Sequence, residues 1–105
     1  MAKYFVTYCG GEQPATPEDG ARHMEKWKAW LAAMGEAVVN PGTPLKDTKT
    51  VSVSSVSDYE GTYPFSGFSV LEADNLDAVL RMVRSCPFLD TGGTMDVSEM
   101  IEMQM

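Results

Sequence analysis

His23 is the single histidine of the chain, and histidine is the residue type that most readily gives and takes a proton near neutral pH. At about 100° per residue, Trp27, Trp30 and Met34 fall on the same side of a helix as His23. An imidazole beside two indole rings could exchange a proton with a flat apolar ligand that stacks on those rings. The same pattern also fits a histidine that closes the edge of a core, with tryptophans that pack inside it.

Two tyrosines add phenolic hydroxyls to this set. Tyr8 ends the first apolar segment, and Tyr63 falls in an expected loop, where it could close over a pocket or pack on its own hairpin. His23 is therefore the candidate catalytic residue. The candidate ligand-binding residues are Trp27, Trp30, Tyr8 and Tyr63.

No motif for a metal or a cofactor is present. Cys9 and Cys86 are the two cysteines, and neither belongs to a C-x-x-C pair or a His/Cys cluster with zinc spacing. The glycine pairs at 10–11 and 92–93 lack the spacing and following helix of a phosphate-binding loop. We expect no cofactor and no metal. The two thiols fit either reduced core residues or a disulfide.

Composition indicates a single globular domain spanning residues 1–105. The net charge of −7 would repel a phosphate backbone, so nucleic acid is not an expected partner. No apolar run approaches the roughly 20 residues of a membrane-spanning helix. The first eight residues are too polar for a signal peptide, which favours a cytoplasmic protein.

The elements that position these residues begin with a helix over 17–34. Thr16 can cap it, Pro17 suits its first turn, and Gly35 ends it. A second helix starts at 74–77 and ends before Pro87. The expected apolar stripes are Met24, Trp27, Leu31 and Met34 in the first helix, and Leu76, Val79, Leu80 and Val83 in the second.

Strands are expected at 3–8, 37–39, 48–56 and 65–72, with a long final strand from Thr94 to beyond residue 100. If the short strand 37–39 is set aside as an edge piece, the order is βαββαβ, which is the ferredoxin-like α+β arrangement. Its antiparallel sheet carries both helices on one face. The first strand is apolar on both sides, which favours a homodimer packed sheet to sheet over a monomer.

The chain resembles the YCII-related family of small dimeric α+β barrel proteins over nearly its whole length. The likeness rests on segments 2–6, 23–30, 67–78, 86–87 and 92–97. They read AKYFV, HMEKWKAW, GFSVLEADNLDA, CP and GGTMDV. The resemblance implies a ferredoxin-like fold, a homodimer, and a cleft between helices and sheet.

The resemblance also bears on function. Most family members have no established activity, while some relatives look like lyases for chlorinated aromatic breakdown products, and more distant families include lactone isomerases. In one branch a first-helix histidine pairs with an aspartate; His23 matches the histidine, but Ala33 and Met34 stand where that aspartate would be. The expected function is a small-molecule lyase or isomerase in which His23 shuttles a proton for an aromatic or lactone-like metabolite. The alternative is a non-catalytic ligand-binding protein or a structural or regulatory dimer, so catalysis itself stays open.

Overall fold

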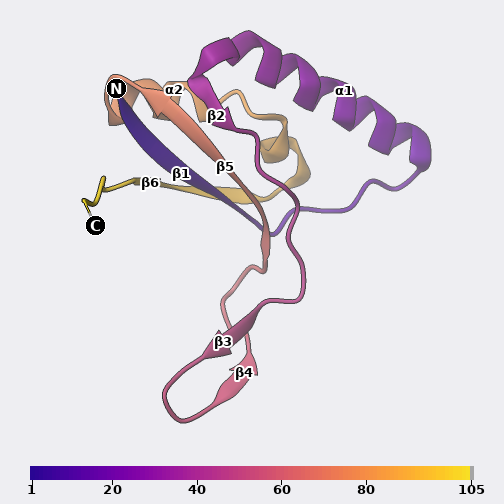
Figure 1. Ribbon diagram of the computed structural model, residues 1–105. Coiled ribbons are helices and arrows are strands. Elements are labelled where there is room, and N and C mark those ends of the chain that lie inside the picture. Colours follow the sequence, from indigo (N-terminus) through magenta and orange to yellow (C-terminus); the bar gives the residue numbers. More distant parts are fainter. Residues whose placement is uncertain (105) are drawn as a thin grey trace.

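The computed structural model describes residues 1–104 and has the expected ferredoxin-like α+β fold (Figure 1). A four-stranded antiparallel sheet has the strand order β2-β5-β1-β6. Two 3₁₀ helices, η1 and η2, follow the two α-helices. In chain order the elements are β1 (Ala2–Cys9), α1 (Pro17–Met34), η1 (Gly35–Ala37), β2 (Val38–Asn40), β3 (Lys49–Val51), β4 (Val56–Asp58), β5 (Phe65–Ala73), α2 (Leu76–Val83), η2 (Pro87–Thr91) and β6 (Thr94–Glu99).

The short strand that the sequence pattern set aside is an integral edge of the sheet. β2 pairs with β5, with Val38 opposite Leu71. The following loop continues along β5, where Pro44 bridges to Gly67 and the amide of Leu45 donates to the carbonyl of Ser66 at 2.9 Å. The expected edge strand at 37–39 is therefore present as β2, and it supplies the second strand of the βαββαβ pattern in place of the strand expected at 48–56.

The strand expected at 48–56 lies outside the sheet. Residues 49–58 form a separate two-stranded hairpin, β3–β4, which extends away from the body of the molecule (Figure 1). The chain reverses at Ser52–Ser55, where the amide of Ser52 donates to the carbonyl of Ser55 at 2.8 Å. The expected loop that contains Tyr63 lies between β4 and β5, after β4 ends at Asp58.

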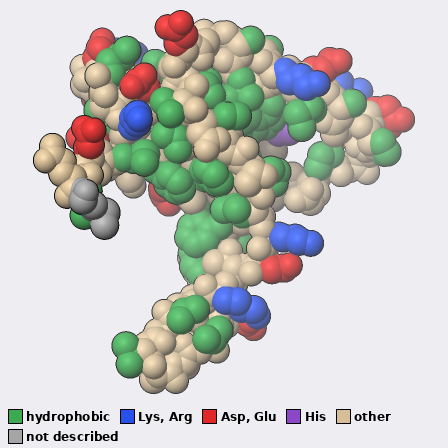
Figure 2. Space-filling view, in the orientation of Figure 1, with side chains coloured by type: hydrophobic (Ala, Val, Ile, Leu, Met, Phe, Trp, Pro, Cys, Tyr) green, Lys and Arg blue, Asp and Glu red, His purple; other side chains and the backbone are tan. Residues whose placement is uncertain are grey.

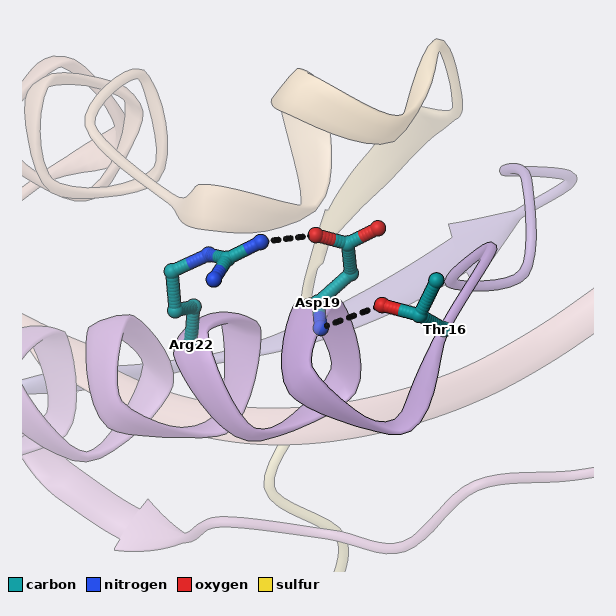
Figure 3. A network of polar contacts seen from close by, with 3 residues as sticks. All are labelled: Thr16, Asp19 and Arg22. Carbon is teal, nitrogen blue, oxygen red and sulfur yellow. Dashed lines mark hydrogen bonds and ion pairs between the residues drawn. The ribbon is translucent and has the colours of Figure 1, made fainter.

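Helix α1 begins and ends at the expected residues. The side chain of Thr16 accepts a hydrogen bond from the amide of Asp19 at 3.1 Å, and Asp19 forms an ion pair with Arg22 one turn further on (Figure 3). A side-chain acceptor at this position satisfies an amide that has no partner inside the helix. The cap fixes where the helix starts and thereby which residues face the sheet.

Both helices pack on one face of the sheet. One core cluster contains Tyr4 and Val6 of β1, Trp30 of α1, and Val79 and Val83 of α2. Trp27, Leu31 and Met34 of the expected α1 stripe pack against this core. Met24 does not, since it is 53% exposed, and Trp30 is the most buried residue of the helix at 6% exposure. Trp30 occupies the space between the sheet and α2, where its indole Nε1–H donates to the carbonyl of Met82 at 3.0 Å.

The opposite face of the sheet has no cover within the described chain. There Phe5 of β1 stacks on Phe68 of β5, with ring centroids 5.5 Å apart and ring planes 11° from parallel. β6 ends at Glu99, so the long final strand expected from the alternating pattern was wrong beyond that residue. Neither α1 nor α2, nor any other helix within residues 1–104, is long and apolar enough to cross a membrane.

Candidate functional site

Four aromatic side chains meet between the sheet and α1. Trp27 lies edge-on to Tyr8 of β1 and to Trp30, with ring centroids 5.2 and 5.3 Å apart. Phe88 of η2 packs on the other side of Tyr8 at 5.2 Å. Edge-to-face contacts of this kind place the positive rim of one ring against the negative face of another. The cluster therefore holds the ring of Trp27 in a defined orientation.

That orientation determines what His23 can do. The indole Nε1–H of Trp27 donates to Nε2 of His23 at 2.6 Å, one helical turn away. A nitrogen that accepts a hydrogen bond carries a lone pair, so in the neutral imidazole the proton resides on Nδ1. The ring consequently offers Nδ1–H as a donor, and its second nitrogen is already occupied by Trp27.

The donor nitrogen of His23 is accessible. Within residues 1–104 every buried side-chain nitrogen or oxygen has a hydrogen-bond partner, and Nδ1 of His23 forms no hydrogen bond there. Nδ1 must therefore lie at the solvent-facing edge of the ring. Figure 2 shows part of the purple imidazole surface recessed between hydrophobic side chains.

The hydroxyl of Tyr8 points into the protein. Ser69 of β5, which is fully buried, donates from Oγ to the carbonyl of Pro41 at 2.8 Å. Its Oγ lies 2.8 Å from the Tyr8 hydroxyl, and because the Ser69 proton is already used, Tyr8 is the donor. Burial raises the pKa of Tyr8 to about 12. Tyr8 is therefore a fixed, neutral phenol in this arrangement.

The structure brings together some of the expected site residues and separates others. His23, Trp27 and Tyr8 form one continuous cluster, and Trp30 adjoins it with its indole N–H turned toward Met82. Tyr63 lies elsewhere, with its ring against the backbone of Gly10 just after β1, and is 50% exposed. It contacts the end of the strand that carries Tyr8.

The aromatic cluster lies between α1 and the sheet. Two open hollows lie on other parts of the surface, and His23, Trp27 and Tyr8 line neither of them. One, of about 550 Å³, separates α1 from the segment joining α2 to η2 and has Trp30 at its base. The other, of about 350 Å³, lies at the root of the β3–β4 hairpin. A ligand that meets His23 must therefore approach the outer edge of the imidazole.

Two residues of the cluster, Ser69 and Phe88, were not singled out in the sequence. Ser69 alternates with Gly67 and Leu71 on the core face of β5, so a polar residue at a core position was the available signal.

Cys86 and Cys9 are both buried and unpaired. Burial raises the pKa of the Cys86 thiol to about 11. Over residues 1–104, no three His, Cys, Asp or Glu side chains gather in a metal-binding group.

Comparison with known proteins adds a fold relationship. No family model matches the chain, and no curated protein is detectably similar to it in sequence. Among solved structures, the chain is similar to 5-chloro-2-hydroxyhydroquinone dehydrochlorinase from Burkholderia phenoliruptrix AC1100, in complex with 2,5-dihydroxybenzoquinone. The TM-score is 0.57 at 17% sequence identity, over 95% of each chain. The two proteins share a fold.

Proposed function

We propose that this chain is a small-molecule lyase or isomerase of the YCII-related type that acts on a compact aromatic or lactone-like metabolite. One observation carries the proposal. The hydrogen bond from Trp27 to Nε2 of His23 orients a half-buried imidazole and leaves Nδ1–H facing solvent. The fold relationship supports the substrate class, because the related dehydrochlorinase was solved with a small quinone.

The geometry favours a particular role for His23. With Nε2 occupied, the neutral ring stabilises negative charge by donating from Nδ1 to a carbonyl or phenolic oxygen of the substrate. A neutral imidazole can polarise a carbonyl in this way as an enolate forms. The proton released by the substrate goes to solvent. The sequence predicted that His23 shuttles a proton, a role that an orienting carboxylate would support. The donor role needs no such carboxylate, because Trp27 already orients the imidazole.

A second candidate is a non-catalytic binding protein. The observation that favours it is that neither open hollow contains His23. Binding needs only a surface of suitable shape and one or two directional hydrogen bonds. Nδ1–H of His23 and the partly exposed ring of Trp27 supply these without any reaction.

We also propose that the protein is a cytoplasmic homodimer packed sheet to sheet. The uncovered face around Phe5 and Phe68 supports the dimer, because an apolar sheet face requires a second layer. The two buried, unpaired thiols of Cys9 and Cys86 support a reducing compartment.

The first experiment is a thermal-shift screen of the wild type, His23→Ala and Trp27→Phe. The probes are 2,5-dihydroxybenzoquinone, small aromatic acids, quinols and lactones. A probe at 100 times its dissociation constant stabilises the native state by about 2.7 kcal/mol, which raises Tm by several degrees in a domain of this size. Each probe that shifts the wild type is then incubated with the protein and followed by absorbance and mass spectrometry.

The outcomes separate the two candidates. Turnover that His23→Ala abolishes and Trp27→Phe lowers supports the enzyme, with Trp27 acting through the imidazole. Binding without turnover, weakened in His23→Ala, supports the binding protein and overturns the enzyme. If no probe binds the wild type, or if His23→Ala binds and reacts as well as the wild type, His23 is not part of a site for this ligand class.

A further inference from the structure

The β3–β4 hairpin presents an apolar tip to solvent. All six residues of its two strands are exposed. Val51 and Val56 face each other across the hairpin and are 74% and 68% exposed, and Val53 in the turn is fully exposed. Residues 50–57 contain no charged side chain. Edge strands that face solvent usually carry charges that oppose association, whereas in this hairpin the charged residues, Lys49 and Asp58, lie only at the root.

The hairpin has little support of its own. It is held by its three cross-strand pairs, by an ion pair between Lys49 and Asp58, and by the turn contacts of Ser52 and Ser55. A two-stranded hairpin is marginally stable by itself in water. An uncharged valine tip on a marginal hairpin indicates a partner surface that covers the valines.

The chain exposes more surface area than a compact folded monomer of its mass. The chain exposes 7619 Å², whereas a folded monomer of 11.5 kDa exposes about 5,800 Å². The Cα radius of gyration is 15.2 Å, against about 13 Å for a compact chain of this length. If a second copy covered this excess of about 1,800 Å² on each chain, the buried area of about 3,600 Å² would fall within the range of obligate dimer interfaces.

The charge distribution favours a second copy of this chain as the partner. A net charge of −7 makes two copies repel each other except where the contacting surfaces are neutral. The hairpin tip is neutral, and so are Phe5, Thr7, Phe68 and Val70 at the centre of the uncovered sheet face, where Asp96 of the edge strand β6 adds one acidic side chain opposite Thr7. At one end of that face Lys3 lies opposite Glu72, so the margin carries both signs of charge.

We propose that the β3–β4 hairpin is an intermolecular arm whose valine tip packs against a second copy of this chain. The arm extends the interface that begins at the uncovered sheet face around Phe5 and Phe68. This inference rests on the homodimer proposed above and is independent of the chemistry at His23. It assigns a role to a hairpin that lies outside both the four-stranded sheet and the aromatic cluster.

The test compares two faces of the same hairpin. Val56 lies on the valine face, and its neighbour Ser57 lies on the opposite face; both are exposed in the isolated chain. Val56→Asp and Ser57→Asp add the same charge at adjacent positions. Sedimentation equilibrium of the wild type, Val53→Asp, Val56→Asp and Ser57→Asp gives the dimer dissociation constants. We expect an increase of at least tenfold for the two valine variants and less than threefold for Ser57→Asp.

The results distinguish the arm from the dimer. If the wild type is monomeric at every concentration measured, both the dimer and the arm are overturned. If the wild type is dimeric and all three variants keep its dissociation constant, the arm is overturned and the dimer stands. Thermal unfolding at the lowest concentration checks folding, and we expect equal monomer melting temperatures because the substituted side chains are exposed. Equal weakening by Val56→Asp and Ser57→Asp also overturns the arm, since added charge alone then explains the effect.

Discussion

The hydroxyl of Tyr8 donates to Oγ of Ser69 at 2.8 Å, which links residues 61 positions apart through their side chains. Oγ of Ser69 in turn donates to the carbonyl of Pro41 at 2.8 Å. Three segments, namely β1, β5 and the loop after β2, are thus connected by one buried hydroxyl. The aromatic cluster that orients His23 rests on this connection, because Tyr8 packs directly against Trp27.

Ser69→Ala should lower the free energy of unfolding by about 1–3 kcal/mol, because it leaves the Tyr8 hydroxyl and the Pro41 carbonyl without a partner. Urea denaturation measures the change. Ser54→Ala in the exposed hairpin turn is the matched control and should stay within about 0.5 kcal/mol of the wild type. Equal stability of the two variants would contradict the buried chain of donors.

Tyr8 should make the protein less stable at high pH. Its pKa is about 12 in the folded chain against the ordinary 10.0, so the stabilisation is complete below pH 10.0 and is lost as the pH rises through 12. We expect the free energy of unfolding to fall across this window in the wild type and in Tyr63→Phe. Tyr8→Phe should show a shallower fall, measured by urea denaturation at a series of pH values. An equal fall in Tyr8→Phe would be inconsistent with this origin.

Trp27→Phe should remove the hydrogen bond that keeps the proton of the neutral His23 imidazole on Nδ1. It keeps an aromatic ring in the cluster but removes the N–H that donates to Nε2. Nitrogen-15 NMR of the imidazole should show a proton on Nδ1 in the wild type and a mixture of tautomers in the variant. Trp30→Phe is the control, since the N–H of Trp30 donates to Met82 rather than to the imidazole. A wild-type ring protonated mainly on Nε2 would refute the proposed donor role.

Gly42→Ala should be far more destabilising than Gly92→Ala. Both glycines have positive φ, 80° and 82°, which costs an alanine about 1–2 kcal/mol. A Cβ on Gly42 would lie 1.5 Å from the carbonyl oxygen of Phe68, whereas nothing lies within 4 Å of a Cβ on Gly92. We expect Gly42→Ala to lose more than about 4 kcal/mol by thermal unfolding, a magnitude typical of severe steric disruption. Comparable losses at the two positions would show that the loop is not packed on β5 as described.

Cys9 and Cys86 should be unreactive in the native protein. Both thiols are buried, and burial raises the pKa of Cys86 to about 11, which suppresses the nucleophilic thiolate. A chromogenic disulfide reagent should react slowly with the folded chain and rapidly with both thiols in urea. Fast labelling of the native protein would indicate that the core around Phe88 opens.

The elements with strong local signals were predictable from the sequence. Thr16, Pro17 and Gly35 delimit α1 as expected, because caps and helix stops act within a few residues of the helix end. The folding of residues 48–58 into a hairpin outside the sheet was not predictable from local signals. Alternating Val, Ser and Thr favour an extended strand but do not specify its partner, and the turn at Ser52–Ser55 has no glycine or asparagine to mark it.

The candidate site likewise has one part that local sequence signals predict and another that depends on tertiary packing. The pair His23 and Trp27 could be anticipated, since residues four apart are neighbours on a helix. The packing of Tyr8 on Trp27, and of Phe88 on Tyr8, depends on how β1 meets α1 and η2, which no local pattern encodes. Met24 illustrates the limit: it fits the apolar stripe, yet it is exposed, while Trp30 is buried against α2.

The pairing of β1 with β6 makes the chain a candidate for circular permutation. The amide of Met100 donates to the carbonyl of Lys3 at 2.8 Å, so the start of β1 and the residue after β6 lie side by side. A short linker could join them, and new termini could open in the exposed turn between Ser54 and Ser55, where nicks and insertions are best tolerated. In such a permutant β6 and β1 would become neighbours along the chain, and one half of the sheet would form as a local hairpin from its β6 edge.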